Sequence, residues 1–136
     1  MQTNKKVLII DDDQAVRQAF RLALEDLDCE IEEAENGEIG VQKFKDDNIG
    51  LVFLDLRMPG MNGLETLLAI RAMDKSVPIY IVTAFYKEYF GDLKKTANEG
   101  IAFDLLNKPV SGDEISTIAK EVMGKCKDKY FLEKTL

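Results

Sequence analysis

Several carboxylates, one hydroxyl and one lysine follow short apolar runs of the chain, at the points where buried strands would end. The candidates are Asp11, Asp12, Asp13, Asp55, Thr83 and Lys108. Carboxylates brought close together repel one another, so some of their pKa values would rise without compensation. A hard divalent cation removes that repulsion, and a set of oxygen ligands suits Mg²⁺. These residues therefore predict a magnesium site.

A carboxylate beside a metal ion, a lysine and a hydroxyl can also act as a nucleophile toward phosphorus. The charge that phosphoryl transfer spreads over three oxygens could be covered by a cation, an ammonium and a hydroxyl or amide donor. The sequence contains no histidine, which excludes a histidine base, a histidine metal ligand and a phosphohistidine on this chain. Its two cysteines form no CxxC pair, so zinc is a poor candidate.

The elements that would position these groups alternate along the chain. Apolar runs of strand length occupy residues 7–10, 51–54, 79–82 and 103–106, of which the first three are continuous, and a weaker strand is expected at 30–34. Such runs suit strands that are covered on both faces. Apolar residues at helical spacing occur between them, over residues 16–27, 64–73 and 115–122. The alternation predicts an α/β fold with a doubly wound parallel sheet, in which ligands bind beyond the carboxyl ends of the strands.

Start signals support the helices. Asn62 with Glu65, and Ser111 with Glu114, have the spacing of a capping box, while Asp13 is interpreted as a helix N-cap rather than a ligand. The chain shows no repeat and no internal boundary, so residues 1–124 are expected to form one domain. Residues 125–136 are interpreted as a C-terminal tail or an extension of the last helix.

Composition excludes some partners. The 18 basic and 25 acidic residues give a net charge of −7 without a basic cluster, so direct nucleic-acid binding is not expected. No apolar run approaches the ~20 residues of a membrane span, and the N-terminus lacks the apolar core of a signal peptide. Both cysteines are expected to be reduced, and the protein is expected to be cytoplasmic.

Four motifs, in this order, resemble those of response-regulator receiver domains. They are the sequence from Val7 to Asp13, the block DLRMPGMNG from Asp55 to Gly63, Thr83-Ala84, and Lys108-Pro109. The resemblance covers roughly residues 5–124. It implies a CheY-like, flavodoxin-like (βα)5 fold with strand order 2-1-3-4-5, and a phosphoacceptor of a two-component system rather than a multiple-turnover enzyme.

The resemblance assigns a role to each residue of the metal site. Asp55 resembles the phosphoacceptor, which also contacts the Mg²⁺ ion. Asp11 and Asp12 resemble the metal-site acids, with Asp12 as the direct ligand and Asp11 acting through water. The backbone carbonyl of Arg57 is implied as a further ligand.

The remaining motif residues would act on the phosphoryl group. Lys108 resembles the lysine that pairs with Asp55 and later with the phosphoryl group, and its bond to Pro109 is expected to be cis. Thr83 resembles the hydroxyl that moves toward the phosphate. The implied partners are a histidine kinase or phosphotransfer protein, a downstream effector protein or fused output domain, and a second copy of the chain on phosphorylation.

The sequence departs from the family pattern between Thr83 and Lys108. The position three residues before Lys108 is often aromatic in the family, but here it is Leu105, with Phe103 two residues earlier. The segment from Thr83 to Lys108 is also a few residues longer than usual, and its part 85–99 is atypical. Its spaced apolar residues are interpreted as the core stripe of a helix rather than a partner surface; they are Tyr86, Tyr89, Phe90, Leu93 and Ala97.

Two bulky residues, Arg57 and Phe85, lie two positions after Asp55 and Thr83 respectively. Our hypothesis is that they shield the aspartyl phosphate from water. Two other functions compete with phosphoacceptance. A phosphatase of the haloacid-dehalogenase type would need a second acid where Arg57 stands. A pseudo-receiver that only binds partners generally lacks an acid or the lysine, and this chain keeps them all.

Overall fold

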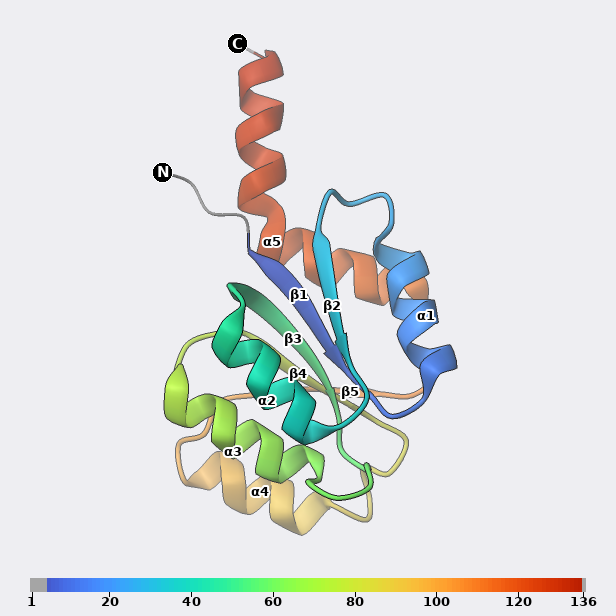
Figure 1. The fold of residues 1–136 in the computed structure, drawn as a ribbon, viewed down its shortest axis with the longest axis vertical. Helices are drawn as coiled ribbons and strands as arrows, with labels where there is room; N and C mark the ends of the chain where they lie inside the picture. Colours follow the sequence, from blue (N-terminus) through green and yellow to red (C-terminus); the bar gives the residue numbers. More distant parts are fainter. Residues whose placement is uncertain (1–4, 136) are drawn as a thin grey trace.

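The computed structural model describes the backbone of residues 5–135 and the side chains of residues 5–124. Over that range five strands alternate with five helices, as predicted (Figure 1). The strands are β1 (Lys6–Ile10), β2 (Glu30–Ala34), β3 (Ile49–Asp55), β4 (Ile79–Thr83) and β5 (Asp104–Asn107). The helices are α1 (Gln14–Leu24), α2 (Gly37–Asp46), α3 (Gly63–Met73), α4 (Phe90–Asn98) and α5 (Gly112–Thr135).

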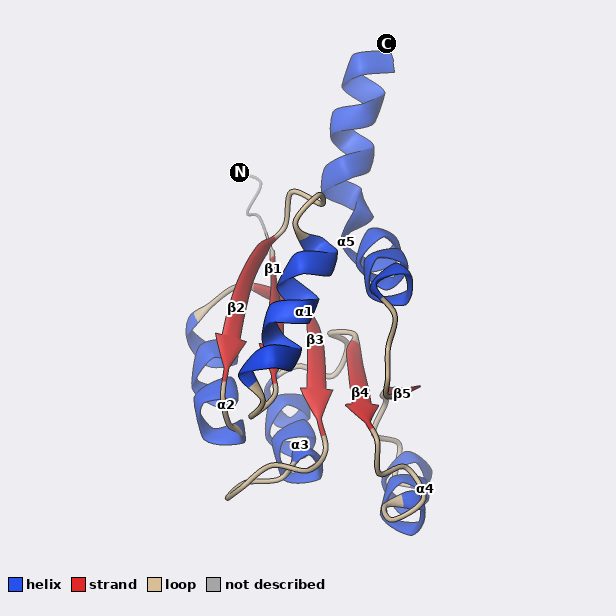
Figure 2. Ribbon diagram, turned by 90° about the vertical axis from the view of Figure 1, so that its right-hand side faces the viewer, coloured by secondary structure: helices blue, strands red, loops and turns tan. Residues whose placement is uncertain are grey.

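The strands form one parallel sheet in the order β2-β1-β3-β4-β5, which confirms the expected topology. The central strand β3 is buried along its whole length, as its uninterrupted apolar sequence predicts. The edge strand β2 instead carries the sequence EIEEA and is only partly covered. All five strands point the same way, so their carboxyl ends meet at one edge of the sheet (Figure 2).

Helices cover both faces of the sheet and create two hydrophobic layers. α1 and α5 lie on one face, where Phe20 and Ile115 pack against Phe53 of β3 and its neighbours (Figure 2). α2, α3 and α4 lie on the other face, where Leu67 and Leu93 belong to the second cluster of buried residues. Both layers consist mainly of apolar side chains, and the two buried acids of the described chain, Asp11 and Asp55, lie at the ends of strands.

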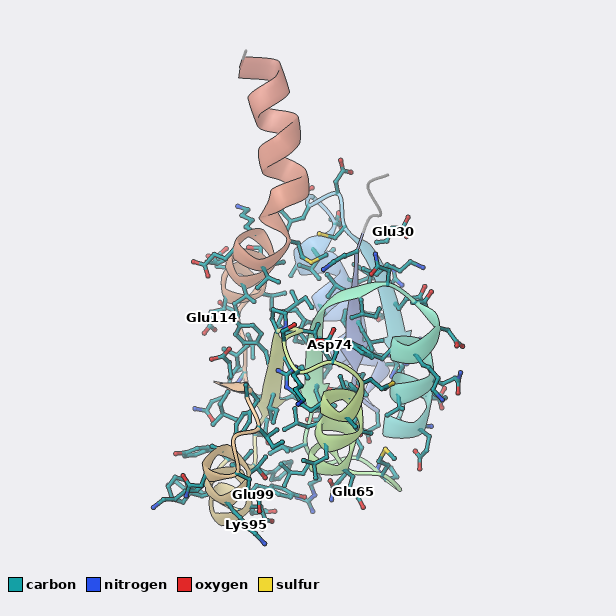
Figure 3. The ribbon with its side chains drawn as sticks, turned by 90° about the vertical axis from the view of Figure 1, so that its left-hand side faces the viewer. Glu30, Glu65, Asp74, Lys95, Glu99 and Glu114 are labelled. Carbon is teal, nitrogen blue, oxygen red and sulfur yellow. The ribbon has the colours of Figure 1, made fainter. Side chains whose placement is uncertain are left out.

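The predicted helix starts are confirmed. The Asn62 side chain accepts from the backbone N–H of Glu65 at 2.9 Å, and the Glu65 side chain accepts from the backbone N–H of Asn62 at 2.9 Å. Ser111 and Glu114 make the same reciprocal pair at 3.1 and 3.0 Å. Figure 3 shows both glutamates at the first turns of α3 and α5. Asp13 caps α1 by accepting from the N–H of Ala15 at 2.9 Å.

The interpretation of the segment 85–99 is partly wrong. Residues 86–89 form a turn, and α4 begins only at Phe90. Tyr86, Tyr89 and Leu93 do pack against the core, but Phe90 is 49% exposed and Ala97 is also exposed. Because the helix begins late, Leu93 and Thr96 form its buried face instead of Phe90 and Ala97. The Thr96 hydroxyl donates to the carbonyl of Asp92.

The last helix runs through the expected domain boundary, since α5 extends from Gly112 to Thr135. The side chains of Cys126 and Tyr130, which suggested an extension of this helix, lie outside the described residues, as do Met1–Asn4 and Leu136. The assignment of residues 125–136 as a separate tail stays a prediction. No helix in the described part of the chain is long and apolar enough to cross a membrane.

Candidate functional site

The predicted site residues come together at the carboxyl edge of the sheet. Asp11 directly follows β1, Asp55 is the last residue of β3, and Lys108 directly follows β5. Asp11, Asp12 and Asp55 each offer a carboxylate oxygen, and these oxygens lie within 4.8 Å of one another. The spatial convergence of acids that the sequence places 44 residues apart is therefore a property of the parallel sheet.

Lys108 connects two of the three acids. Its Nζ donates to Asp11 Oδ2 and to Asp55 Oδ1, at 3.1 Å in both cases. Burial by itself would lower the pKa of Lys108, but the Asp55 and Asp11 carboxylates raise it overall. The lysine therefore remains a cation at neutral pH and offsets part of the repulsion between the two acids. Its peptide bond to Pro109 is cis, as expected.

The environment of Asp55 perturbs its pKa strongly. Its side chain is only 6% exposed. Burial raises the pKa of Asp55 to about 6, the negative charge of Asp11 adds to the rise, and the nearby Lys108 ammonium opposes it. Three carboxylates beside one lysine leave an excess of negative charge, and a divalent cation would relieve this imbalance. Among the described residues this group of possible ligands consists of carboxylates alone, which matches the oxygen preference of Mg²⁺.

The backbone orients Asp11. The N–H of Asp13 donates to Asp11 Oδ1 at 2.9 Å, while Asp11 Oδ2 receives the Lys108 ammonium. Asp11 is 3% exposed, whereas Asp12 is exposed to solvent at the mouth of the site. Asp11 therefore sits inside the site with both oxygens engaged, and Asp12 is the more accessible acid.

Thr83 is the last residue of β4 and is fully buried. Its Oγ1 accepts from the backbone N–H of Phe85 at 2.8 Å, and its carbonyl accepts from the N–H of Lys108 at 2.9 Å. The second contact ties the end of β4 to the residue that follows β5. Thr83 thus lies next to Lys108 through its backbone, and its role in the site and the movement of its hydroxyl toward a phosphate stay predictions.

The loop from Asp55 to Gly63 depends on a close backbone approach. A Cβ on Gly63 would lie 2.3 Å from the carbonyl oxygen of Asp55 and 2.6 Å from the Cα of Leu56. The N–H of Gly63 donates to the carbonyl of Leu56 at 2.8 Å, which closes the loop. Met58 is 7% exposed and belongs to the hydrophobic core.

Arg57 and Phe85 lie against each other, although they follow different strands. The Arg57 guanidinium carbon is 4.3 Å from the centroid of the Phe85 ring, a cation–π distance. Arg57 Nη1 also lies 3.8 Å from Glu88 Oε1. The two bulky side chains that the sequence singled out therefore form one contact beside Asp55 and Thr83. The direction of the Arg57 carbonyl toward a metal ion stays a prediction.

Leu105 occupies the position where the family pattern often has an aromatic side chain. It is partly buried and packs against the same cluster as Tyr86, Tyr89 and Phe103. Aromatic rings are thus present in this layer, but they come from the turn after Thr83 and from the residue before β5.

Sequence reasoning did not identify Arg17 and Glu33. Arg17 Nη1 donates to the backbone carbonyl of Asp11 at 2.6 Å, and its Nε donates to Glu33 Oε1 at 2.9 Å. An arginine on α1 and a glutamate on an edge strand are usually solvent-facing, so neither carries a signal by itself. Only the sheet order, which places β2 beside β1, brings them to the site.

This fold and acid-lined edge define the class of CheY-like receiver proteins, and sequence comparison gives the family. The family model described as "Response regulator receiver domain" matches residues 7–120. The chain belongs to this family. The chain is 34% identical over 111 residues to the chemotaxis protein CheY of Listeria monocytogenes, covering 81% of this chain and 91% of CheY.

Longer relatives and solved structures agree. Identity to the transcriptional regulatory protein ResD of Bacillus subtilis is 42% over 84 residues, which is 61% of this chain but 35% of ResD. The chain thus matches about a third of ResD, and the matched part is 26% of the regulatory protein AtoC of Escherichia coli. Response regulator TrrA of Thermotoga maritima, solved with Mg²⁺-BeF, is 35% identical with a TM-score of 0.73 over 87% of this chain and 98% of TrrA.

Proposed function

We propose that this receiver domain is a phosphoacceptor, in which Asp55 takes a phosphoryl group from a histidine kinase or a phosphotransfer protein in a Mg²⁺-dependent reaction. One observation carries the proposal: the Lys108 ammonium lies 3.1 Å from both Asp55 and Asp11, inside a group of three acids. An acid ending a fully buried strand is costly unless it has such partners. This arrangement pairs a nucleophile with the cation that its phosphorylated form would need.

The acids Asp11, Asp12 and Asp55, together with the carbonyl of Arg57, would hold the Mg²⁺ ion. When bound, the ion would neutralise the carboxylates and the charge on the transferring phosphoryl oxygens. The TrrA structure contains Mg²⁺-BeF, and the similarity of this chain to TrrA supports the same cation here. Burial and the negative charge of Asp11 raise the pKa of Asp55, and a bound cation would oppose both effects by stabilising the ionised carboxylate.

The chain's own residues would carry the phosphoryl chemistry. An oxygen of the ionised Asp55 carboxylate would form the bond to phosphorus as the bond between phosphorus and the donor's nitrogen breaks. Lys108, which already donates to Asp55, would then donate to a phosphoryl oxygen. The Thr83 hydroxyl would supply a further donor after it leaves its contact with Phe85. Water would later cleave the acyl phosphate, so the domain acts as a timed switch.

The output follows from the position of Thr83. A hydroxyl drawn toward the phosphate would release Phe85 and the turn at residues 86–89, and would shift the surface formed by β4, α4 and β5. The proposed receivers of this change are a downstream effector protein, a fused output domain or a second copy of the chain, in the cytoplasm. Several relatives are much longer than the matched region, which is consistent with output domains in those proteins.

The test is phosphorylation by acetyl phosphate, read by intact mass. Wild type with Mg²⁺ should gain one phosphate, and the adduct should be absent with EDTA and absent in Asp55→Ala. The matched control is Asp13→Asn, which removes a neighbouring charge while keeping an N-cap side chain. An unmodified wild type that also binds no Mg²⁺ would contradict the proposal and favour a pseudo-receiver.

A further inference from the structure

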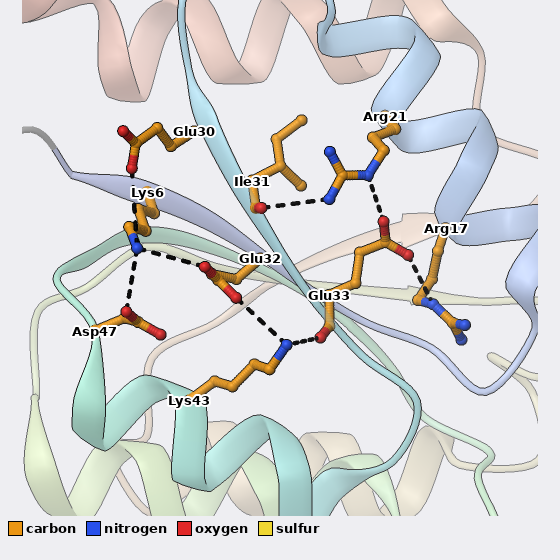
Figure 4. A network of polar contacts seen from close by, with 9 residues as sticks. All are labelled: Lys6, Arg17, Arg21, Glu30, Ile31, Glu32, Glu33, Lys43 and Asp47. Atoms are coloured by element: carbon orange, nitrogen blue, oxygen red, sulfur yellow. Dashed lines mark hydrogen bonds and ion pairs between the residues drawn. The ribbon is translucent and has the colours of Figure 1, made fainter.

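A network of ion pairs surrounds the edge strand β2, and it has two groups, around Glu32 and around Glu33, which Lys43 links by donating to the Glu33 backbone carbonyl (Figure 4). Because side chains alternate along a strand, Glu32 and Glu33 point to opposite faces. On one face Lys6 and Lys43 contact Glu32. On the other face Glu33 receives Arg17 and Arg21, both from α1. The group around Glu32 covers an exposed strand edge, but the group around Glu33 reaches the functional site.

Arg17 makes the connection. Its Nε donates to Glu33 Oε1 at 2.9 Å, and its Nη1 donates to the backbone carbonyl of Asp11 at 2.6 Å. Its side chain is 14% exposed, so the guanidinium is held between strand and loop rather than free in solvent. The rigid, planar fork of arginine can bridge two acceptors in this way with defined directions.

The contact falls on the one part of Asp11 that the other site residues leave unfixed. Asp11 Oδ1 accepts from the N–H of Asp13, Oδ2 accepts from Lys108, and the Asp11 N–H donates to the carbonyl of Ala34 at 3.1 Å. The Asp11 carbonyl belongs to the peptide unit that leads into Asp12. Since a peptide unit is planar, fixing this carbonyl also fixes the direction in which the chain enters Asp12.

We propose that Arg17, anchored by Glu33, is a positioning residue that orients the Asp11–Asp12 peptide for Mg²⁺ binding. The inference rests on the proposed magnesium site and deepens it. Arg17 contacts Glu33 and the backbone carbonyl of Asp11, so it would act through the backbone. Residues that orient ligands in this way typically change metal affinity by about 10–100-fold when they are removed.

The sign of the effect separates positioning from simple charge. Arg17 is a cation near a site for a second cation, so its charge alone would weaken Mg²⁺ binding. Removing that charge should then tighten Mg²⁺ binding. Loss of positioning should do the opposite. Arg21 is the matched control, because it shares Glu33 but its Nη2 reaches the carbonyl of Ile31, at 3.4 Å, rather than the site.

The experiment measures the Kd for Mg²⁺ of the full chain by isothermal titration calorimetry, with amide NMR of Asp12 as a second readout. Arg17→Gln should raise the Kd roughly tenfold and shift the Asp12 amide resonance in the metal-free protein. Arg21→Gln should leave the Kd within about twofold of wild type and the Asp12 amide resonance at its wild-type position. With acetyl phosphate, Arg17→Gln should phosphorylate slowly at low Mg²⁺ and recover at saturating Mg²⁺, because the residue does not contact the reacting atoms.

A milder substitution protects the test against a folding defect. Arg17→Lys keeps the charge but cannot keep both directed contacts, so its Kd should still rise, by about threefold or more. Wild-type affinity in Arg17→Lys, or equal affinities for Arg17→Gln and Arg21→Gln, would overturn the inference. If the wild type itself binds no Mg²⁺, the proposed function fails instead, and the two failures are therefore distinguishable.

Discussion

Replacing Asp55 by asparagine should make the metal-free protein more stable at neutral pH. The Asp55 side chain is 6% exposed and ends a strand that is buried along its length. Burial raises its pKa to about 6, with Asp11 contributing and Lys108 opposing. An ionised Asp55 is therefore a cost to the fold that the proposed function requires, and Asp55→Asn removes it without changing the side-chain volume.

The magnitude follows from proton linkage. A pKa of about 6 in the folded state and about 3.9 in the unfolded chain differ by about two units, each worth about 1.4 kcal/mol. Ionisation of Asp55 should thus cost roughly 3 kcal/mol of unfolding free energy. Because the folded state holds its proton more tightly, stability should fall as pH rises from about 4 to about 6 and then level off.

The assay is urea denaturation in EDTA between pH 4.5 and 8, followed by circular dichroism because the chain has no tryptophan. The free energy of unfolding of Asp55→Asn should exceed that of wild type by about 2–3 kcal/mol at pH 7, and the difference should shrink toward pH 4.5. Adding Mg²⁺ should narrow the gap at pH 7, because a cation that binds only the folded state stabilises wild type more.

Asp12→Asn is the control for this measurement. Asp12 belongs to the same group of acids but is exposed, so water already solvates its charge. Asp12→Asn should therefore change the pH dependence of the free energy of unfolding much less than Asp55→Asn does. Parallel pH profiles for wild type and Asp55→Asn, or an Asp55→Asn protein no more stable than wild type at pH 7, would refute the reasoning that Asp55 is held ionised at a cost.

Three further outcomes are expected. Phe85→Ala should speed loss of the phosphate from the phosphorylated protein, measured by mass over time, because it removes the ring that packs on Arg57; an unchanged rate would sink the shielding hypothesis. Gly63→Ala should cost about 1–3 kcal/mol in urea denaturation, since its Cβ would meet the Asp55 carbonyl, and wild-type stability would contradict the close approach. Asp74 (labelled in Figure 3) accepts from the backbone N–H groups of Ser76 and Val77. Both hydrogen bonds lower the pKa of Asp74, and the bond from Ser76 has the larger effect. Asp74→Ala should therefore lower the free energy of unfolding by about 1 kcal/mol at pH 7, and this loss should fade as pH falls below about 4; a loss independent of pH would show that the ionised carboxylate is not the stabilising form.

The local features of the fold were predictable from the sequence. Strand β2 was predicted with its observed bounds, and the other strands were predicted to within two residues at each end. The three caps at Asp13, Asn62 and Ser111 were also predicted, because a cap is a contact between near neighbours. The start of α4 was not, since Tyr89 provides no side-chain cap and the stripe from Tyr86 fits a turn followed by a helix equally well.

The sequence alone determined the alternation of strands and helices, the group of acids and the lysine that the site would use. These follow from residue types and from spacing along the chain. The tertiary structure decided which groups touch: Lys108 between Asp11 and Asp55, and Arg57 on Phe85. It also decided that Arg17 reaches the carbonyl of Asp11. These contacts depend on strand order and on the rotation of helices against the sheet, which are set by burial of the whole apolar surface at once.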